Sequence, residues 1–96
     1  MKAEIDGAQI HSQADLHKTL ARTLDFGPYY GANLSALWDR LTTDVERPVE
    51  VIWHNTEASR DHMGEEQFTQ IRDLLQAVAE QDETHEQSNR FTVRFL

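Results

Sequence analysis

The sequence predicts a small two-layer α/β domain with a three-stranded parallel sheet and about four helices. Three β-rich segments (KAEIDG, VEVIW and RFTVRFL) alternate with stretches of helical periodicity, in the order β-α-α-β-α-α-β. This order favours parallel strands joined by right-handed crossovers. So few helices cannot cover both faces of three strands, which indicates two layers. At 96 residues the chain is too short for two domains, so we expect one domain over residues 1–96.

The first strand and first helix are defined by their boundary residues. KAEIDG is typical of a short strand that closes in an Asp-Gly turn. The segment SQAD, with Ser12 as the N-cap, resembles a capping box. The helix that follows has one apolar face, formed by Leu16, Leu20 and Leu24. Gly27-Pro28 is expected to end it.

A second helix is predicted over residues 33–43. Asn33 is a favourable N-cap residue. The apolar positions follow the i, i+3, i+4, i+7 spacing of one helix face, and they are Leu34, Leu37, Trp38 and Leu41. Trp38 is expected to lie mainly in the core, with one edge at the protein surface.

The C-terminal half continues the alternation. Pro48 precedes the strand VEVIW, and either isomer of the Arg47–Pro48 bond is compatible with the sequence. Asn55 or Thr56 would cap a short helix or turn that ends at Gly64. The longest helix is expected from about residue 65 to 81, with Phe68, Ile71, Leu75 and Val78 on its buried face. QDETHEQSN contains no apolar residue and is typical of a mobile loop, after which RFTVRFL alternates as a half-buried strand.

The composition is that of an acidic globular chain. The net charge is −8, with 39% hydrophobic and 27% charged residues, and residues 57–87 hold nine acidic side chains but only two basic ones. This charge argues against binding to nucleic acid or an anionic membrane, and favours a basic partner or simple solubility. No apolar run could span a bilayer, the N-terminus has no secretory h-region, and cysteine is absent. We therefore expect a cytoplasmic protein without disulfides.

No motif for catalysis, metal binding or cofactor binding is present. The five histidines lack metal-ligand spacing, and no GxSxG, Walker A or GxGxxG sequence occurs. His54 and His62 flank an expected helix beside Asp61, but surface histidines are the preferred interpretation. An acid–base enzyme is the least favoured class. We expect no metal, no cofactor and no enzymatic activity.

The segment PYYGANLSALWDRL carries the candidate binding surface. With the apolar stripe of helix 33–43 facing inward, Ser35, Asp39 and Thr42 share an outward strip, because positions i, i+4 and i+7 lie together. Tyr29 precedes this helix, and a rigid aromatic beside a carboxylate has the chemistry of a binding hot spot. The same residues also fit a plainer interpretation, in which a tyrosine staples the first turn and the aspartate is only solvated.

This segment resembles the signature of the barstar family, intracellular inhibitors of barnase-type microbial ribonucleases. The shared pattern runs from Pro28 to Asp39 as PYYGxNLxALWD. Similarity extends to DGAQIHSQADLHKTL near the N-terminus and to Leu41, Thr42, Val45, Glu46, Pro48 and Trp53. The resemblance is strong over residues 1–53 and weaker beyond, where a helix of suitable length and a closing strand continue it.

The resemblance implies three parallel strands with packed helices, in agreement with the interpretation from periodicity. It also implies that helix 33–43 and the loop before it plug the active site of a basic ribonuclease, in a one-to-one complex with a monomeric inhibitor. Asp39 would replace an RNA phosphate, because a carboxylate accepts charge-assisted bonds from the Arg, Lys and His side chains that bind phosphate. The implied partner-binding residues are Tyr29, Asn33, Ser35, Trp38, Asp39, Thr42, Asp44, Glu46 and Gln76.

Four residues depart from the family pattern. Ser35 and Gln76 stand where the best-known inhibitor of the family has carboxylates, and Thr43-Asp44 replaces an expected Gly-Trp pair. Asp44 and Glu46 would partly restore negative charge at the end of the helix. Because each lost interfacial charge can cost a few kcal/mol, affinity for a barnase-like enzyme is expected to fall by orders of magnitude. A second hypothesis therefore keeps the fold but assigns a regulatory binding module whose partner is not a ribonuclease.

Overall fold

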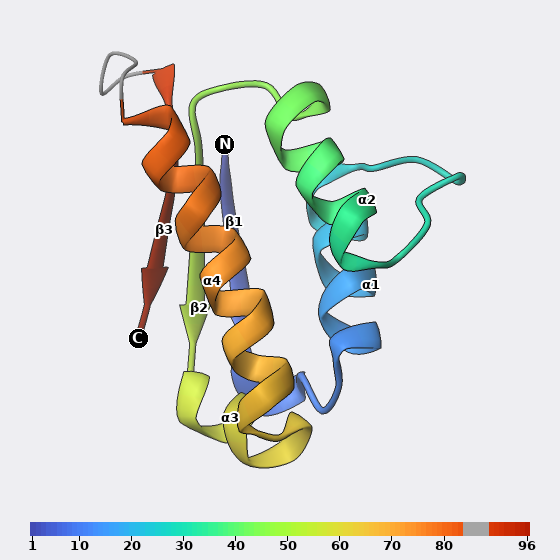
Figure 1. Ribbon diagram of the computed structural model, residues 1–96, viewed down its shortest axis with the longest axis vertical. Helices are drawn as coiled ribbons and strands as arrows, with labels where there is room; N and C mark the ends of the chain where they lie inside the picture. The colour runs from blue at the N-terminus through green and yellow to red at the C-terminus, as the bar shows by residue number, and fades with distance from the viewer. Residues whose placement is uncertain (84–88) are drawn as a thin grey trace.

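The computed structural model describes residues 1–83 and 89–96 and shows a three-stranded sheet with helices packed against one face (Figure 1). The strands are β1 (Lys2–Asp6), β2 (Val49–His54) and β3 (Phe91–Phe95). They pair in parallel in the order β1-β2-β3, with Ala3 opposite Val51 and Val51 opposite Val93. The expected two-layer α/β fold is confirmed.

Helices connect the strands. Within the described residues the α-helices are α1 (Gln13–Leu24), α2 (Leu34–Asp39), α3 (Thr56–Met63) and α4 (Glu65–Asp82). A short 3-10 turn, η1 (Gly7–Gln9), follows β1, and a π-helical turn, η2 (Arg40–Asp44), continues α2. The helix expected over residues 33–43 is therefore divided into two segments of different pitch. The segment after Asn55, for which a helix or a turn was compatible with the sequence, is a helix.

The predicted caps have different outcomes. Ser12 caps α1 by accepting a hydrogen bond from the backbone N–H of Asp15 at 3.2 Å, as the capping pattern predicts. Asn55 occupies the N-cap position of α3 in a left-handed conformation (φ 53°), and its side chain makes no capping bond. Instead its Nδ2 donates to Asp6 Oδ1 at 3.0 Å and so ties the end of β2 to the end of β1.

The core lies between the sheet and the helices. The apolar faces predicted from periodicity are buried, including Leu16, Leu20 and Leu24 of α1 and Phe68, Ile71, Leu75 and Val78 of α4. Trp53 is fully buried, and its Nε1 donates to Ser59 Oγ at 2.9 Å. Ser59 in turn donates to the carbonyl oxygen of Gly7 at 2.8 Å. The polar groups at this end of the core therefore have hydrogen-bond partners, as buried polar groups require.

The segment expected to be a mobile loop, residues 81–89, is only partly described. Its first two residues belong to α4, and residues 84–88 lie outside the described residues. The Arg47–Pro48 peptide bond, which leads into β2, is cis. In the part of the chain that the structure describes, no helix is long and apolar enough to cross a membrane.

Candidate protein-binding site

Two adjacent tyrosines in the loop before α2 have different environments. The hydroxyl of Tyr30 lies 2.6 Å from Nδ1 of His17 in α1, and its ring packs edge-on against Phe26. Tyr29, in contrast, is 90% exposed. Tyr30 therefore anchors the loop to α1, while Tyr29 is presented to solvent next to the start of α2.

The loop turns sharply just before α2 begins. Ala32 has φ 52°, a left-handed conformation that is unfavourable for a residue with a Cβ. Asn33 then caps the helix, since its Oδ1 accepts a hydrogen bond from the N–H of Ala36 at 2.8 Å. This local geometry confirms Asn33 as the N-cap and commits its side-chain oxygen to the helix start.

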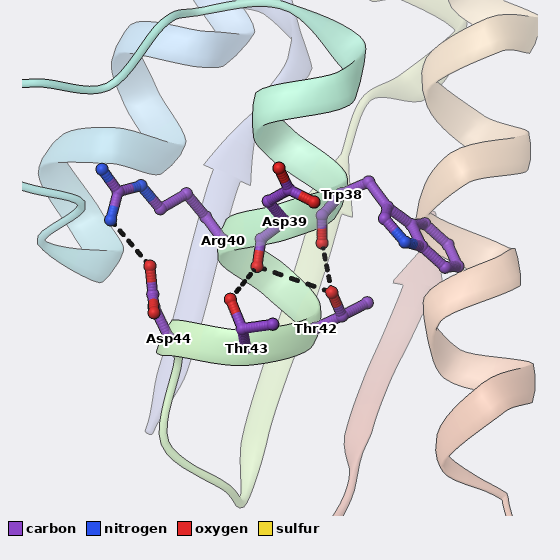
Figure 2. Close-up of polar contacts among 6 residues, drawn as sticks. All are labelled: Trp38, Asp39, Arg40, Thr42, Thr43 and Asp44. Carbon is purple, nitrogen blue, oxygen red and sulfur yellow. Dashed lines mark hydrogen bonds and ion pairs between the residues drawn. The ribbon is translucent and has the colours of Figure 1, made fainter.

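The burial of α2 determines which side chains face a partner. Leu37 and Leu41 are fully buried, whereas Ser35 and Asp39 are exposed. Figure 2 shows the indole of Trp38 directed toward α4, and this side chain is half-buried against the core. The inward stripe is confirmed at Leu37 and Leu41, whereas Leu34 and Trp38 are only partly buried. Ser35 and Asp39 lie on the outward side of the helix.

The π-helical turn changes the end of this surface. The N–H of Val45 donates to the carbonyl of Arg40 at 3.1 Å, and Thr42 Oγ1 donates to the carbonyl of Trp38 at 2.7 Å. The Thr43 hydroxyl also donates to the carbonyl of Asp39 (Figure 2). Thr42 is therefore half-buried with its hydroxyl proton used within the helix, whereas the sequence pattern places it fully outward.

The carboxylates of this surface differ in their partners. Asp39 makes no hydrogen bond or ion pair through its side chain with any residue that the structure describes (Figure 2). Asp44 accepts a 2.7 Å ion pair from Nη1 of Arg40, and Glu46 is exposed. The face therefore offers Asp39 as an uncommitted carboxylate, while Asp44 is already paired.

Comparison with known proteins agrees with this geometry. The family model described as Barstar (barnase inhibitor) matches residues 1–95. The chain belongs to the barstar family. It is also 38% identical over 82 residues to a Bacillus subtilis (strain 168) protein named "Putative ribonuclease inhibitor YrdF", and the matched region covers 85% of this chain and 86% of that protein. Membership of the family supports a ribonuclease-inhibitor-like role.

Gln76 lies apart from the other binding residues expected in this barstar-family chain. It is exposed and sits roughly 140° around α4 from the buried Ile71, at about 100° per residue. Gln70, which accepts a hydrogen bond from Gln13 of α1, lies on the opposite flank of α4. α2 packs on the same side of α4 as α1 (Figure 1), and the hydrogen bond from Gln13 places Gln70, not Gln76, on the flank that meets α1.

His17 and Tyr30 form a buried contact that the sequence analysis did not identify. His17 is only 2% exposed, and burial lowers its pKa below the ordinary value. Burial likewise raises the pKa of Tyr30 to about 12, although the nearby charge of Arg40 opposes this shift. Both groups are therefore neutral at pH 7, and the contact between them is a neutral hydrogen bond.

The end of the binding segment in this family member is fixed by a second unpredicted contact. Nε of Arg47 lies 2.7 Å from Oδ2 of Asp82, and both side chains are largely buried. The same carboxylate oxygen accepts the N–H of Phe91 at 2.7 Å, and Arg47 Nη1 donates to the carbonyl of Val45 at 2.8 Å. Asp82 thus holds the chain that leaves η2 against the end of α4 and the start of β3.

The histidines considered as metal ligands have other neighbours. His54 Nε2 lies 3.1 Å from Glu4 Oε1, and the His62 ring packs at a tilt against His11 with centroids 4.3 Å apart. Across residues 1–83 and 89–96, no group of three His, Cys, Asp or Glu side chains is arranged to hold a metal ion.

Proposed function

We propose that this protein is a cytoplasmic inhibitor of a basic microbial ribonuclease or related toxin, and that it acts as a single domain. The Tyr29 loop and the α2–η2 segment plug the active site of the enzyme. The observation that carries this proposal is the Asp39 carboxylate, which is exposed and uncommitted on a helix held rigidly by its buried stripe, in a chain of the barstar family.

Asp39 supplies the chemistry of inhibition by standing in for an RNA phosphate. A ribonuclease holds phosphate with cationic side chains, and a carboxylate can accept charge-assisted bonds from the same groups. The carboxylate of Asp39 has no internal partner to give up on binding. The net charge of −8 attracts a basic enzyme and speeds the encounter, which matters when the target is toxic to the cell.

The remaining contacts surround Asp39. Tyr29 contributes a large apolar area at low entropic cost, and it needs no rearrangement because Tyr30 anchors the loop. The proposed contact set keeps the residues expected from the sequence, with Gln76 as its most distant member: Tyr29, Asn33, Ser35, Trp38, Asp39, Thr42, Asp44, Glu46 and Gln76. The complex is one-to-one, formed by a free monomer, and needs no nucleic acid, membrane, metal, cofactor or catalytic activity of the inhibitor.

The test is Asp39→Ala, measured by inhibition of barnase-type ribonucleases and by direct binding. Truncating one partner of an interfacial charge pair costs about 2–5 kcal/mol, so affinity should fall roughly 30-fold to 5000-fold. Asp73→Ala is the matched control, because it removes an exposed carboxylate from α4, outside the Tyr29 loop and the α2–η2 segment. Inhibition by the wild type that Asp39→Ala leaves unchanged would disprove the assigned interface.

The alternative is a barstar-fold regulatory module whose protein partner is not a ribonuclease. It is favoured by two observations on the same face: Ser35 is neutral, and Asp44 is paired with Arg40. Affinity capture from native lysate with wild-type and Asp39→Ala baits separates the two functions. Two results together would establish the alternative. The wild type alone captures a partner without ribonuclease activity, and the wild type inhibits no barnase-type enzyme.

A further inference from the structure

The binding segment contains a single cation. Arg40 is the only basic residue between Arg22 and Arg47, so the loop and the α2–η2 segment are otherwise neutral or acidic. Its side chain lies on the α1 side of the helix, where it forms the 2.7 Å ion pair with Asp44 (Figure 2). The charge of Arg40 also lowers the pKa of Tyr30, against the larger effect of burial.

The flank of the binding segment beside Arg40 carries several carboxylates. Asp44 lines a hollow of about 370 Å³ together with Asp25 and Glu46, so three carboxylates border one depression beside the binding segment. Arg47 and Met1 also line it, but the guanidinium of Arg47 is held by Asp82 and the amino group of Met1 donates to the carbonyl of Pro48 at 2.9 Å. Arg40 is therefore the cation that offsets the charge of Asp44.

We propose that Arg40 is a specificity-determining residue of the binding face, an inference that rests on the proposed function. By holding Asp44, Arg40 leaves Asp39 as the uncommitted carboxylate of α2–η2. The face then suits a ribonuclease that presents one cationic cluster at its phosphate site. It disfavours an enzyme that places further cations against the Asp44 flank, because an unfavourable like charge is an effective way to reject a competing partner.

The weakness of the ion pair supports this role. Arg40 and Asp44 are 30% and 53% exposed in their side chains and stand at i and i+4. Exposed pairs of this kind add little to stability, so the pair contributes little to the fold itself. Its main effect is on the charge that a partner meets, and charge near an interface acts chiefly on association rate and partner choice.

The experiment measures association and inhibition with barnase, the enzyme named in the family description, at low and high salt. Arg40→Ala should raise the association rate constant about 3-fold to 10-fold at low salt, because it removes a cation and releases Asp44. Asp44→Ala should lower it by a similar factor, and the double variant should return close to the wild type. These differences should shrink at about 0.5 M salt because the charges are screened.

Arg72→Ala is the matched control. It removes one positive charge that is also paired with a neighbouring aspartate, at 3.1 Å, but lies on α4, outside the Tyr29 loop and the α2–η2 segment. It should change the rate less than about 2-fold. Arg40→Gln serves as a second variant that keeps a long polar side chain, and thermal unfolding of each variant checks that η2 remains folded.

The outcomes separate the two proposals. Binding to barnase by Arg40→Ala where the wild type binds weakly or not at all would support the role of Arg40 most directly. Two outcomes would overturn that role while leaving the proposed function intact. In one, Arg40→Ala binds barnase more weakly than the wild type; in the other, Arg40→Ala and Arg72→Ala raise the association rate constant equally. Failure of the wild type to inhibit any barnase-type ribonuclease, with no variant binding barnase, would overturn both.

Discussion

Asp82→Ala should destabilise the protein severely, because one carboxylate oxygen serves two buried donors. Asp82 is 5% exposed, and its Oδ2 lies 2.7 Å from both Nε of Arg47 and the N–H of Phe91. Breaking a buried ion pair from one side costs about 3–5 kcal/mol, and a buried N–H left without an acceptor costs about 1–3 kcal/mol. Since these penalties overlap, we expect a loss of about 4–6 kcal/mol in the free energy of unfolding.

A loss of this size is a large part of the total stability of a domain, which is about 5–15 kcal/mol. The assay is urea unfolding at pH 7, followed by the fluorescence of the buried Trp53 and by circular dichroism. Asp82→Asn keeps the volume and one acceptor oxygen, so it should lose less, about 2–3 kcal/mol. If Asp82→Ala unfolds too readily to measure, Asp82→Asn supplies the comparison.

Asp73→Ala provides the contrast for this prediction. Its carboxylate pairs with Arg72 at 3.1 Å, but it is 60% exposed, so its loss should cost less than about 0.5 kcal/mol. Replacing Arg47 by Met in the Asp82→Ala background should recover part of the lost stability, because no uncompensated charge then stays buried. The reasoning is refuted if Asp82→Ala lies within about 1 kcal/mol of the wild type, or if the two aspartate variants lose the same amount.

Two further predictions concern the fold around the site. Gly7→Ala should lower the free energy of unfolding by several kcal/mol, because an added Cβ would lie 2.3 Å from the backbone oxygen of Asn55. Urea unfolding measures this loss, and an unchanged midpoint of the urea transition would show that η1 can move away. The lowered pKa of His17 means that the folded state favours the neutral imidazole, so this contribution to stability is present above the ordinary pKa of 6.5 and is lost as pH falls below it. The unfolding free energy of the wild type should therefore fall between pH 7.5 and 5 more steeply than that of His17→Gln, and parallel curves would contradict the assignment.

The fold was predictable because its signals are local and periodic. Leucines at i, i+4 and i+8 define the buried face of α1, and alternating residues define β3 as half-buried. Asn33 and Ser12 are short polar side chains placed directly before apolar stripes, and both cap helices as predicted. Each of these features depends on neighbours within a few residues, so the sequence order contains them.

The contacts that position the site join residues far apart in the chain, and no local pattern marks them. His17 meets Tyr30 across 13 residues, and Arg47 meets Asp82 across 35. The hydrophilic neighbours of Asp82 predict a polar loop, yet Asp82 is buried where α4 packs against β3. The widened turn at η2 has no local signal either, because the predicted apolar stripe ends at Leu41, which stays buried, and the change of pitch falls at Arg40–Asp44.

These two long-range contacts explain how a partner could change without a change of fold. Tyr30 holds the chain before α2, and Arg47 holds the chain after η2, so both ends of the binding segment are fixed by buried groups. Between them, Ser35 and Asp39 are exposed and take no part in the core. Substitutions at such exposed positions usually alter stability by less than about 0.5 kcal/mol, whereas a charge at an interface can alter affinity by orders of magnitude. The scaffold therefore holds the Asp39 carboxylate in place and leaves the exposed charges around it free to change without loss of the fold.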